Sequence, residues 1–381
     1  MKNTLTAWRA AAMVAIAGLA VRQHLHSPGF FSSRRAEKKR LEEVIPGVLA
    51  ADANPVDVAR AREPGRGRDA GSPVEIPLRG WRDIMLRVWN AIGEDRVLAV
   101  AGGVVFAELL AIFPAITAFV SLYALFANPQ TIADHLIAAS AIMPAEAYSV
   151  VHDEVMRVVT TGTGALSLAS VISLVVAVFS ANSGTKAIFD ALNVAYREKE
   201  KRGFIRLNLL SLAFTFGAII FLIIGIAGIV VLPLVFGFFG IQEFGTRLLD
   251  VLRWPVLFIL TVAGLSVLYR WGPSRREARW RWITPGCAAA AILWLIGSGI
   301  FSWYLSNFAN YGKTYGSLGA AVGLMMWMWV TFVIFLMGAE MDAEMEHQTA
   351  RDTTTGGEKP LGKRGAFMAD RIGKAQEPGA A

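Results

Sequence analysis

The sequence predicts an all-α, polytopic membrane protein: a six-transmembrane-helix bundle with amphipathic helices on its outer and cytoplasmic faces. Of the 381 residues 54% are hydrophobic, and they form long blocks with almost no charge. Each block reaches the ~20 residues that a helix needs to cross a hydrocarbon core. A single segment satisfies its backbone polar groups in lipid only as a helix. The basic residues behind the net charge of +7 crowd into short connectors, which a membrane explains better than nucleic acid does.

The residues before the bundle divide into two parts. Residues 1–21 are mostly apolar but few and contain Arg9, so they suit either an N-terminal membrane anchor or a cleaved signal peptide. Residues 22–75 are polar and rich in Pro, Gly, Ala and Arg, and we expect a disordered cytoplasmic linker. The membrane domain then occupies 76–345, and a cytoplasmic tail occupies 346–381.

Residues 78–94 are expected to form an amphipathic helix at the cytoplasmic face. Apolar residues recur at helical spacing and three arginines lie elsewhere on its surface: Leu78, Trp81, Met85, Val88 and Ile92, with Arg79, Arg82 and Arg87. Tryptophan together with arginine on such a helix suits the headgroup layer. Alternatively the helix packs against the cytoplasmic end of the bundle, and the two arrangements are compatible.

Six long apolar segments follow, at 97–127, 165–189, 207–236, 252–270, 283–305 and 316–339. A connector of over 30 residues separates the first two segments. Its apolar residues indicate two amphipathic helices on the outer surface, one on each side of Pro144: Ile132, Leu136 and Ile137, then Val151, Val155, Val158 and Val159.

Lysine and arginine alternate between the connectors, and this alternation orients the bundle. The stretch before the first segment and the second and fourth connectors are basic: Arg79, Arg82, Arg87 and Arg96; Arg197, Lys199, Lys201, Arg202 and Arg206; Arg270, Arg275, Arg276, Arg279 and Arg281. The other connectors hold few basic residues: Arg157, then Arg247 and Arg253, then Lys313. Because basic loops stay inside, both ends of the bundle are expected in the cytoplasm. Trp271, Trp280 and Trp282 beside the fourth connector fit an aromatic belt at the interface.

Five segments resemble the YihY/BrkB family of bacterial inner-membrane proteins: AGGVVFAELLAIFPAITAFVSLYALFANP (101–129), SANSGTKAIFDALNVAYREKEKRGF (180–204), residues 252–286, FSWYLSNFANYGKTYGSLGAAVG (301–323) and GAEMDAEMEHQTARDTT (338–354). The resemblance implies six helices in the bacterial inner (cytoplasmic) membrane. The family carries a virulence-factor label and an older ribonuclease BN label, generally regarded as a misassignment, and its activity is poorly defined. After Phe106 its members usually have an aromatic residue, whereas this chain has Ala107 and Glu108.

Glu108 is the main candidate functional residue. It lies roughly 16 Å into the first segment at 1.5 Å per residue, near mid-membrane, where ionisable groups are costly and usually functional. We expect either a proton or substrate site that faces the bundle interior, or a neutral acid hydrogen-bonded to a neighbouring helix.

Other candidates lie near the two membrane surfaces. Lys186 and Asp190 share a helix face at the inner interface, where they suit a structural pair or a transport site. Asn182 lies just above them and is suited to line a cavity that opens inward.

Two acids and a tyrosine complete the set. Glu340 and Asp342 end the sixth segment, where they are expected to pair with arginines of the basic connectors or to form a solvated helix end. Tyr311, with its neighbour Asn310, is expected at the outer end of the fifth and sixth segments, as an outer gate or a hydrogen-bonded turn.

Enzyme signatures are missing from the sequence. The five histidines show no metal-ligand spacing, and no phosphate-binding loop, dinucleotide fingerprint or nucleophile elbow occurs. We therefore expect no catalytic residue, metal site or cofactor. The leading hypothesis is a transporter-like protein or one that handles lipid or envelope components. The alternatives are a non-transporting membrane scaffold and, less favoured, a membrane-associated ribonuclease. The expected partners are the bilayer and its anionic lipids, and no nucleic acid.

Overall fold

The structure, a computed structural model, describes residues 54–123, 168–238, 242–307 and 318–376, together with residues 148, 152, 153, 155 and 156. The predicted N-terminal anchor at 1–21 and Tyr311 lie outside these residues. Nearly all of the connector that was expected to form outer-face helices also lies outside them.

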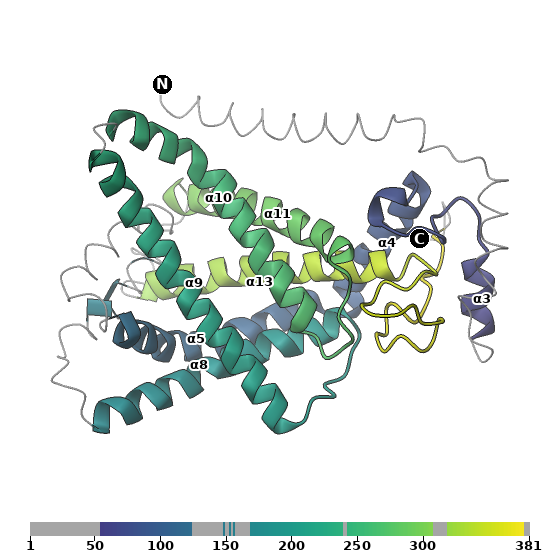
Figure 1. Ribbon diagram of the computed structural model, residues 1–381, viewed down its shortest axis with the longest axis horizontal. Helices are drawn as coiled ribbons and strands as arrows, with labels where there is room; N and C mark the ends of the chain where they lie inside the picture. The colour runs from purple at the N-terminus through teal and green to yellow at the C-terminus, as the bar shows by residue number, and fades with distance from the viewer. Residues whose placement is uncertain are drawn as a thin grey trace.

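Helices are the regular elements of the described chain, which confirms the all-α prediction. In chain order they are α3 (Pro55–Ala61), the 3-10 helix η2 (Pro73–Glu75), α4 (Leu78–Glu94), α5 (Val97–Tyr123), α8 (Leu168–Ala195), α9 (Phe204–Phe238), α10 (Gln242–Trp271), α11 (Trp280–Asn307) and α13 (Leu318–Glu346) (Figure 1). Within these residues a single β-bridge joins Ala278 to Thr354.

Five of the described helices contain a stretch long and apolar enough to cross a membrane: Val97–Ile116 in α5, Phe204–Phe221 in α9, Trp254–Trp271 in α10, Trp280–Leu305 in α11 and Ala321–Glu346 in α13. They correspond to the first and the third to sixth predicted segments, and they are the helices of a multi-pass membrane protein. The second predicted segment, 165–189, lies mostly within α8, which is not among the five. A count of six spans therefore stays a prediction.

Several helices run past the ends of the apolar segments. α8 continues to Ala195 and α13 to Glu346, although their apolar segments end near 189 and 339. A helix can continue past its apolar stretch as long as its backbone groups and polar side chains find hydrogen-bond partners. The additional turns carry polar and charged side chains that find partners, as described below.

α13 lies at the centre of the bundle and packs against α11, α5, α4 and α8. The most extensive helix contact joins α5 and α8. The buried faces of this pair carry small residues, among them Ala101 of α5 and Ala181, Gly184 and Ala191 of α8. Small residues let two helix backbones approach closely, which supplies the packing energy that apolar burial does not supply in lipid.

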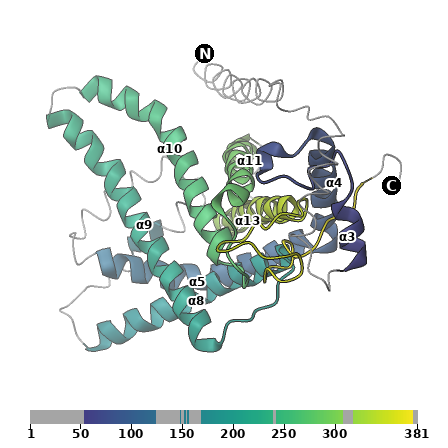
Figure 2. The ribbon, with the colours of Figure 1, turned by 45° about the vertical axis from the view of Figure 1, so that its right-hand side comes forward.

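α9 and α10 form a hairpin that diverges from the rest of the bundle (Figures 1 and 2). α9 packs mainly on α8, and α10 packs mainly on α11. Large apolar side chains of both helices are exposed, among them Phe204, Ile205, Ile220 and Ile259. On a membrane-spanning helix such a surface faces lipid.

Residues 54–76 and 347–376 fold together at one end of the bundle, in a unit that we call the terminal cap (purple and yellow in Figure 1). The first of these segments lies largely within the range for which the sequence predicts disorder, yet it contains α3 and η2. A small apolar cluster joins the two halves of the cap: Ala61, Ala350, Leu361 and Ile372. Since these contacts join opposite ends of the chain, local composition does not reveal them.

Candidate functional site

Polar side chains of α8 and α9 face each other within two otherwise apolar helices. We call this set the polar row: Asn182, Thr185 and Lys186 of α8, with Asn208, Ser211 and Thr215 of α9. Spacings of three and four residues place each trio on one helix face. The hydroxyls of Thr185 and Thr215 lie 2.8 Å apart. Lys186 Nζ donates a hydrogen bond of 2.6 Å to Asn208 Oδ1.

Most donors of the α9 trio bond to carbonyls one turn earlier: Ser211 to Leu207, Thr215 to Ser211 and Asn208 to Phe204. Asn182 differs from them. Its side chain is fully buried, and within the described part of the chain neither its amide nitrogen nor its amide oxygen has a hydrogen-bond partner. Asn182 lies one turn from Lys186, on the face of α8 that contacts α9. A buried amide without partners costs about 1–3 kcal/mol, so its presence requires an explanation.

The contact expected between Lys186 and Asp190 is not formed. Lys186 bonds to Asn208, and among the described residues no carboxylate lies within ion-pairing distance of it. Asp190 is exposed, and its charged neighbours are Glu200 and Arg202. Among the described residues Lys186 therefore has no acidic partner, although it lies in the contact between two helices. A basic side chain without an acidic partner is costly to bury and is suited to bind an anion.

Glu108 lies half-buried on α5 and faces α8. A Cβ atom at Gly184 would lie 2.8 Å from its carboxyl carbon and from both carboxyl oxygens. The glycine therefore makes room for the carboxyl group between the two helices. Within the described part of the chain Glu108 forms no hydrogen bond or ion pair. It thus faces the bundle rather than lipid, without the neighbouring hydrogen bond that one of the sequence hypotheses requires.

Toward the terminal cap, the bundle interior next to Glu108 is filled by apolar side chains. The void there has a volume of about 10 Å³ and is lined by residues such as Val104, Ile188 and Phe335. This volume is at the lower limit for one water molecule. No open polar path from Glu108 to the cap passes through this void.

Four acidic residues alternate along the last two turns of α13: Glu340, Asp342, Glu344 and Glu346. Each is at most 2% exposed, so the two predicted residues among them do not lie at a solvated helix end. Asp342 accepts a hydrogen bond of 2.7 Å from the backbone N–H of Gly286 on α11. Neither carboxyl oxygen of Glu340 has a hydrogen-bond partner. Neither Glu340 nor Asp342 makes the arginine contact expected for it.

Arginine contacts occur instead at the next acids along α13. Arg87 of α4 is nearly buried and donates to the side chains of Glu344 and Gln348. The sequence predicts Arg87 on the helix surface. This prediction is wrong because the partners of Arg87 lie 257 and 261 residues away along the chain. The sequence signal that we missed is the alternation of acids in EMDAEME, which places Glu340 and Glu344 on one face of α13.

The opposite face of the same two turns holds a second ion pair. Arg275, from the connection between α10 and α11, donates two hydrogen bonds of 2.9 and 2.8 Å to Glu346. Glu346 also accepts from the hydroxyl of Thr353 in the terminal cap. The guanidinium of Arg275 lies 4.1 Å from the ring centre of Tyr196 at the end of α8. This buried pair therefore ties α8, the α10–α11 connection, α13 and the cap together.

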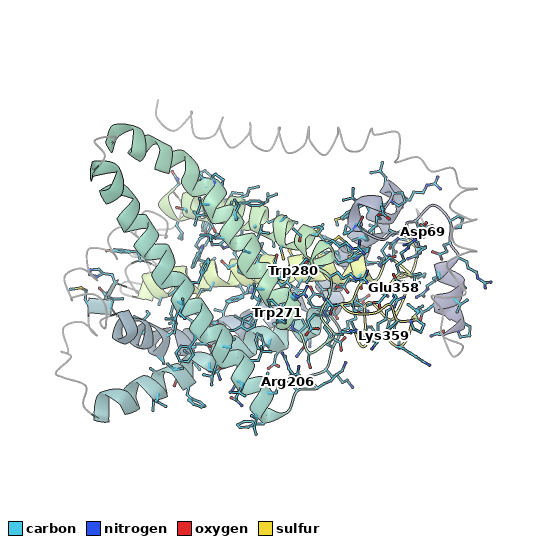
Figure 3. The ribbon with its side chains drawn as sticks, in the orientation of Figure 1. Asp69, Arg206, Trp271, Trp280, Glu358 and Lys359 are labelled. Atoms are coloured by element: carbon cyan, nitrogen blue, oxygen red, sulfur yellow. The ribbon has the colours of Figure 1, made fainter. Side chains whose placement is uncertain are left out.

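Further buried arginines hold the terminal cap itself. Arg68 donates to the carbonyls of Gln348 and Gly373 and to the carboxylate of Glu63. Arg364 is 1% exposed and donates to four backbone carbonyls: Ala350, Arg351, Lys359 and Ala369. Figure 3 shows the side chains crowding at this end of the molecule, where Asp69, Glu358 and Lys359 are labelled.

The tryptophans beside the α10–α11 connection divide into two kinds. Trp271 and Trp280 are partly exposed and meet edge to face with ring centres 5.6 Å apart (Figure 3). Arg270 lies over both rings. Trp282 is 1% exposed and packs under α4. The predicted aromatic belt therefore does not include Trp282.

Glu200 and His347 are among the ionisable groups outside the spans whose pKa values are shifted. Three hydrogen bonds from Arg202 lower the pKa of Glu200 to about 2, mainly through the side-chain contact. Burial lowers the pKa of His347, although the nearby carboxylate of Glu344 opposes this effect. Glu200 is therefore ionised at pH 7.

Comparisons with known proteins identify a family. Residues 88–361 match the protein family described as Virulence factor BrkB. The chain is 31% identical over 239 residues to the ribonuclease-like protein YfkH of Bacillus subtilis, a match that covers 62% of this chain and 85% of YfkH. It is 26% identical over 268 residues to a UPF0761 membrane protein of Psychromonas ingrahamii, covering 69% and 87% of the two chains. A UPF0761 membrane protein of Rhodospirillum centenum is 27% identical over 329 residues, covering 82% and 64%. No solved structure matches.

Proposed function

Because the chain belongs to the Virulence factor BrkB family, we propose that it is a bacterial inner-membrane protein that binds and moves an amphipathic or small polar substrate along the polar row. The family match confirms the resemblance recognised in the sequence. It supports a membrane protein and leaves the activity undefined, so the substrate pathway is our own proposal.

The proposed orientation places the terminal cap and both ends of the bundle in the cytoplasm, with α8 as the second of six spans. The support is the alternation of basic connectors. The connections from α8 to α9 and from α10 to α11 carry many of the basic residues. Both contact the cap: Glu198 accepts from the backbone N–H of Phe367, and the backbone N–H of Arg276 donates to the carbonyl of Gly365. Both connections therefore lie at the same end of the bundle, as the proposed topology requires.

One observation carries the proposed pathway: a fully buried amide of the polar row lacks hydrogen-bond partners among the described residues, and the lysine one turn away lacks an acidic partner there. The amide belongs to Asn182, and the lysine is Lys186. Polar and ionisable groups in membrane helices are costly and usually mark substrate or ion pathways. A substrate with acceptor oxygens would satisfy both the amide and the ammonium donors.

Glu108 is a second candidate site, on the other side of α8 from the polar row. The carboxyl group faces Gly184 of α8, and residues two apart, such as Asn182 and Gly184, point to opposite sides of a helix. This placement meets the requirement that a transport residue face the bundle interior. Because the void toward the cap is apolar and small, the proposed route runs along the α8–α9 contact and avoids the bundle centre.

The test uses purified protein in liposomes, with lipid scrambling and solute efflux measured in parallel. The variant Thr185→Val/Thr215→Val removes the hydroxyl pair of the polar row with little change in volume. Thr261→Val on α10 is the matched control, because its hydroxyl bonds only to the carbonyl of Leu257 in the same helix. We expect the rate to fall about tenfold in the double variant, the equivalent of ~1.4 kcal/mol, and to stay within about twofold in the control.

Equal rates in the double variant and the wild type would contradict a substrate pathway along the polar row. If wild-type liposomes transport no better than protein-free liposomes in both assays, the transport proposal itself fails.

A non-transporting scaffold is the second candidate, and a specific observation favours it. The terminal cap borders an open pocket of about 360 Å³ between α3, the α8–α9 connection and the C-terminal segment. Its lining is rich in charged side chains: Asp57, Glu198, Lys201, Asp370 and Arg371. A scaffold predicts a folded protein without transport activity and with a partner that binds at the cap.

We propose no catalytic role. The relative YfkH of Bacillus subtilis is named a ribonuclease-like protein. In the part of the chain that the structure describes, no group of three His, Cys, Asp or Glu side chains is placed to hold a metal ion. RNA cleavage by the purified protein that disappears on substitution of Glu344 or Asp342 in still-folded variants would overturn this proposal.

A further inference from the structure

α4 exposes a set of apolar side chains that a helix on a water-soluble protein would bury. Its exposed side carries apolar side chains, with Leu78 62% and Trp89 75% exposed, and Met85 and Leu86 also exposed. Its buried side carries Asp83 and, as described above, Arg87. At 100° per residue the exposed apolar positions fall on one continuous arc.

The buried side of α4 is held by charge as well as by packing. Asp83 is 1% exposed, forms an ion pair with Arg66 and accepts from the backbone N–H of Gln376. With the Arg87–Glu344 pair on the next turn, α4 is anchored to both halves of the terminal cap and to α13. The exposed face is therefore the side that α4 turns away from the protein.

The packing of α4 sets its level along the bundle. Ile84 and Val88 contact Trp282 and Met345. These two residues lie at the ends of the candidate spans Trp280–Leu305 and Ala321–Glu346. α4 is therefore level with the place where these spans end, which is the headgroup layer of a membrane crossed by them.

The exposed face continues into the lipid-facing surface of α5. Only Asp95 and Arg96 separate the two helices, and Arg96 adopts the left-handed conformation, with φ of 52°. On α5, Leu98, Phe106 and Leu110 are 50–67% exposed. The apolar surface of one helix is thus followed directly by that of the other.

Arginines lie within the same arc of α4. Arg79 and Arg82 are exposed, and among the described residues neither has a carboxylate within ion-pairing distance. Arg82 falls between Leu78 and Leu86 on the helix surface. A helix with tryptophan and aliphatic side chains on one face, flanked by free arginines, suits the boundary between acyl chains and anionic headgroups.

We propose that the outer face of α4, formed by Leu78, Arg79, Arg82, Met85, Leu86 and Trp89, is a binding surface for anionic phospholipids in the leaflet next to the terminal cap. This surface is independent of the polar row. Arg79 and Arg82 bind the headgroup phosphates, while Trp89 and the aliphatic side chains enter the layer beneath. Since Arg87 ties α4 to α13, bound lipid holds the inner end of the central helix in place.

The insertion of this face is tested with a nitroxide label at Trp89→Cys. Cys287 is the only cysteine of the chain and is fully buried, so the labelled wild type serves as the blank. Glu358→Cys, an exposed position on the cap, is the matched control. In liposomes we expect the label at 89 to be more accessible to oxygen than to a water-soluble nickel complex, and the label at 358 to show the reverse.

Equal accessibility at the two positions would overturn the membrane placement. Shielding of the label at 89 from both reagents would also overturn it, because that result indicates a protein partner.

The charge requirement is tested by lipid retention. Anionic and zwitterionic lipids bound to the detergent-purified protein are counted by native mass spectrometry, for the wild type and for Arg79→Gln/Arg82→Gln. Arg62→Gln, an exposed arginine of the cap, is the control. We expect anionic-lipid affinity to fall about fivefold for each of the two arginines removed, with zwitterionic binding unchanged. Unchanged anionic binding in the double variant would overturn the proposal, whatever the transport assay shows.

Discussion

The terminal cap and the polar row both bury polar side chains, but they satisfy them differently. In the cap and at the adjoining helix ends, buried arginines such as Arg68, Arg87 and Arg364 each donate to several acceptors. In the polar row, Asn182 donates to none, and Lys186 meets a neutral amide in place of an acid.

Glu340 of α13 is an exception near the cap, because neither of its carboxyl oxygens has a partner among the described residues. Apart from this exception, the difference supports a structural role for the cap and agrees with the pathway that we propose along the polar row. A buried charge with a complete set of partners has little net effect on stability, whereas removing one partner is strongly destabilising. A buried group without a partner is destabilising as it stands, and such exceptions concentrate at functional sites. Substitutions in the cap should therefore reduce stability, whereas substitutions in the polar row should reduce activity and leave stability intact.

The largest expected effect is that of Glu344→Ala. It leaves Arg87 buried without its carboxylate, and breaking a buried pair in this way costs about 3–5 kcal/mol. The free energy of unfolding in detergent measures the loss. Glu358→Ala, at an exposed position of the cap, is the control and should stay within ~0.5 kcal/mol of the wild type. A loss below 1 kcal/mol in Glu344→Ala would show that the cap does not depend on this pair.

Gly184→Ala should cost less, about 1–3 kcal/mol, because its Cβ would lie 2.8 Å from the carboxyl group of Glu108. The Glu108→Ala/Gly184→Ala double variant should recover part of the loss, and the coupling energy measures the contact. Gly264→Ala is the control, since no atom lies within 4 Å of the Cβ position there. If Gly184→Ala and Gly264→Ala cost the same stability, the carboxyl group of Glu108 does not lie against Gly184 of α8.

Asn182→Leu should separate stability from activity. Replacing an amide without partners by an apolar side chain of similar size should leave stability unchanged or raise it by about 1 kcal/mol. Transport in liposomes should fall, because the donor is lost from the polar row. Full transport in a stable Asn182→Leu variant would show that the unpaired amide is a packing compromise without a function.

The smallest effect concerns Glu200 in the α8–α9 connection. Arg202 holds the pKa of Glu200 at about 2, below the usual 4.5, so the folded state favours the ionised form. The stabilisation is therefore complete above pH 4.5 and is lost as the pH falls toward 2. The difference in unfolding midpoint between wild type and Glu200→Gln should be present at pH 7 and shrink below pH 4.5. A constant difference across this range would rule out the ionic origin.

Local patterns in the sequence predict the helices well. The apolar blocks predict α5, α9, α10, α11 and α13, since the length of an apolar segment is itself the signal for a membrane helix. The ends of these helices are predicted less well. α13 continues through four acids beyond the end of its apolar segment, because each of those side chains is buried by neighbours that hydropathy does not register.

The sequence by itself determined that this chain is an α-helical membrane protein of the BrkB family, because segment length, charge alternation and family motifs are all properties of contiguous residues. It also singled out Glu108, Asn182 and Lys186. Tertiary structure alone decided their surroundings: the carboxyl of Glu108 against Gly184, and Lys186 on Asn208. It also decided which side chains of α4 are exposed, and that residues 54–76 and 347–376 fold together as the terminal cap. Those features depend on partners up to 315 residues apart, and no local pattern specifies which buried charge will meet which.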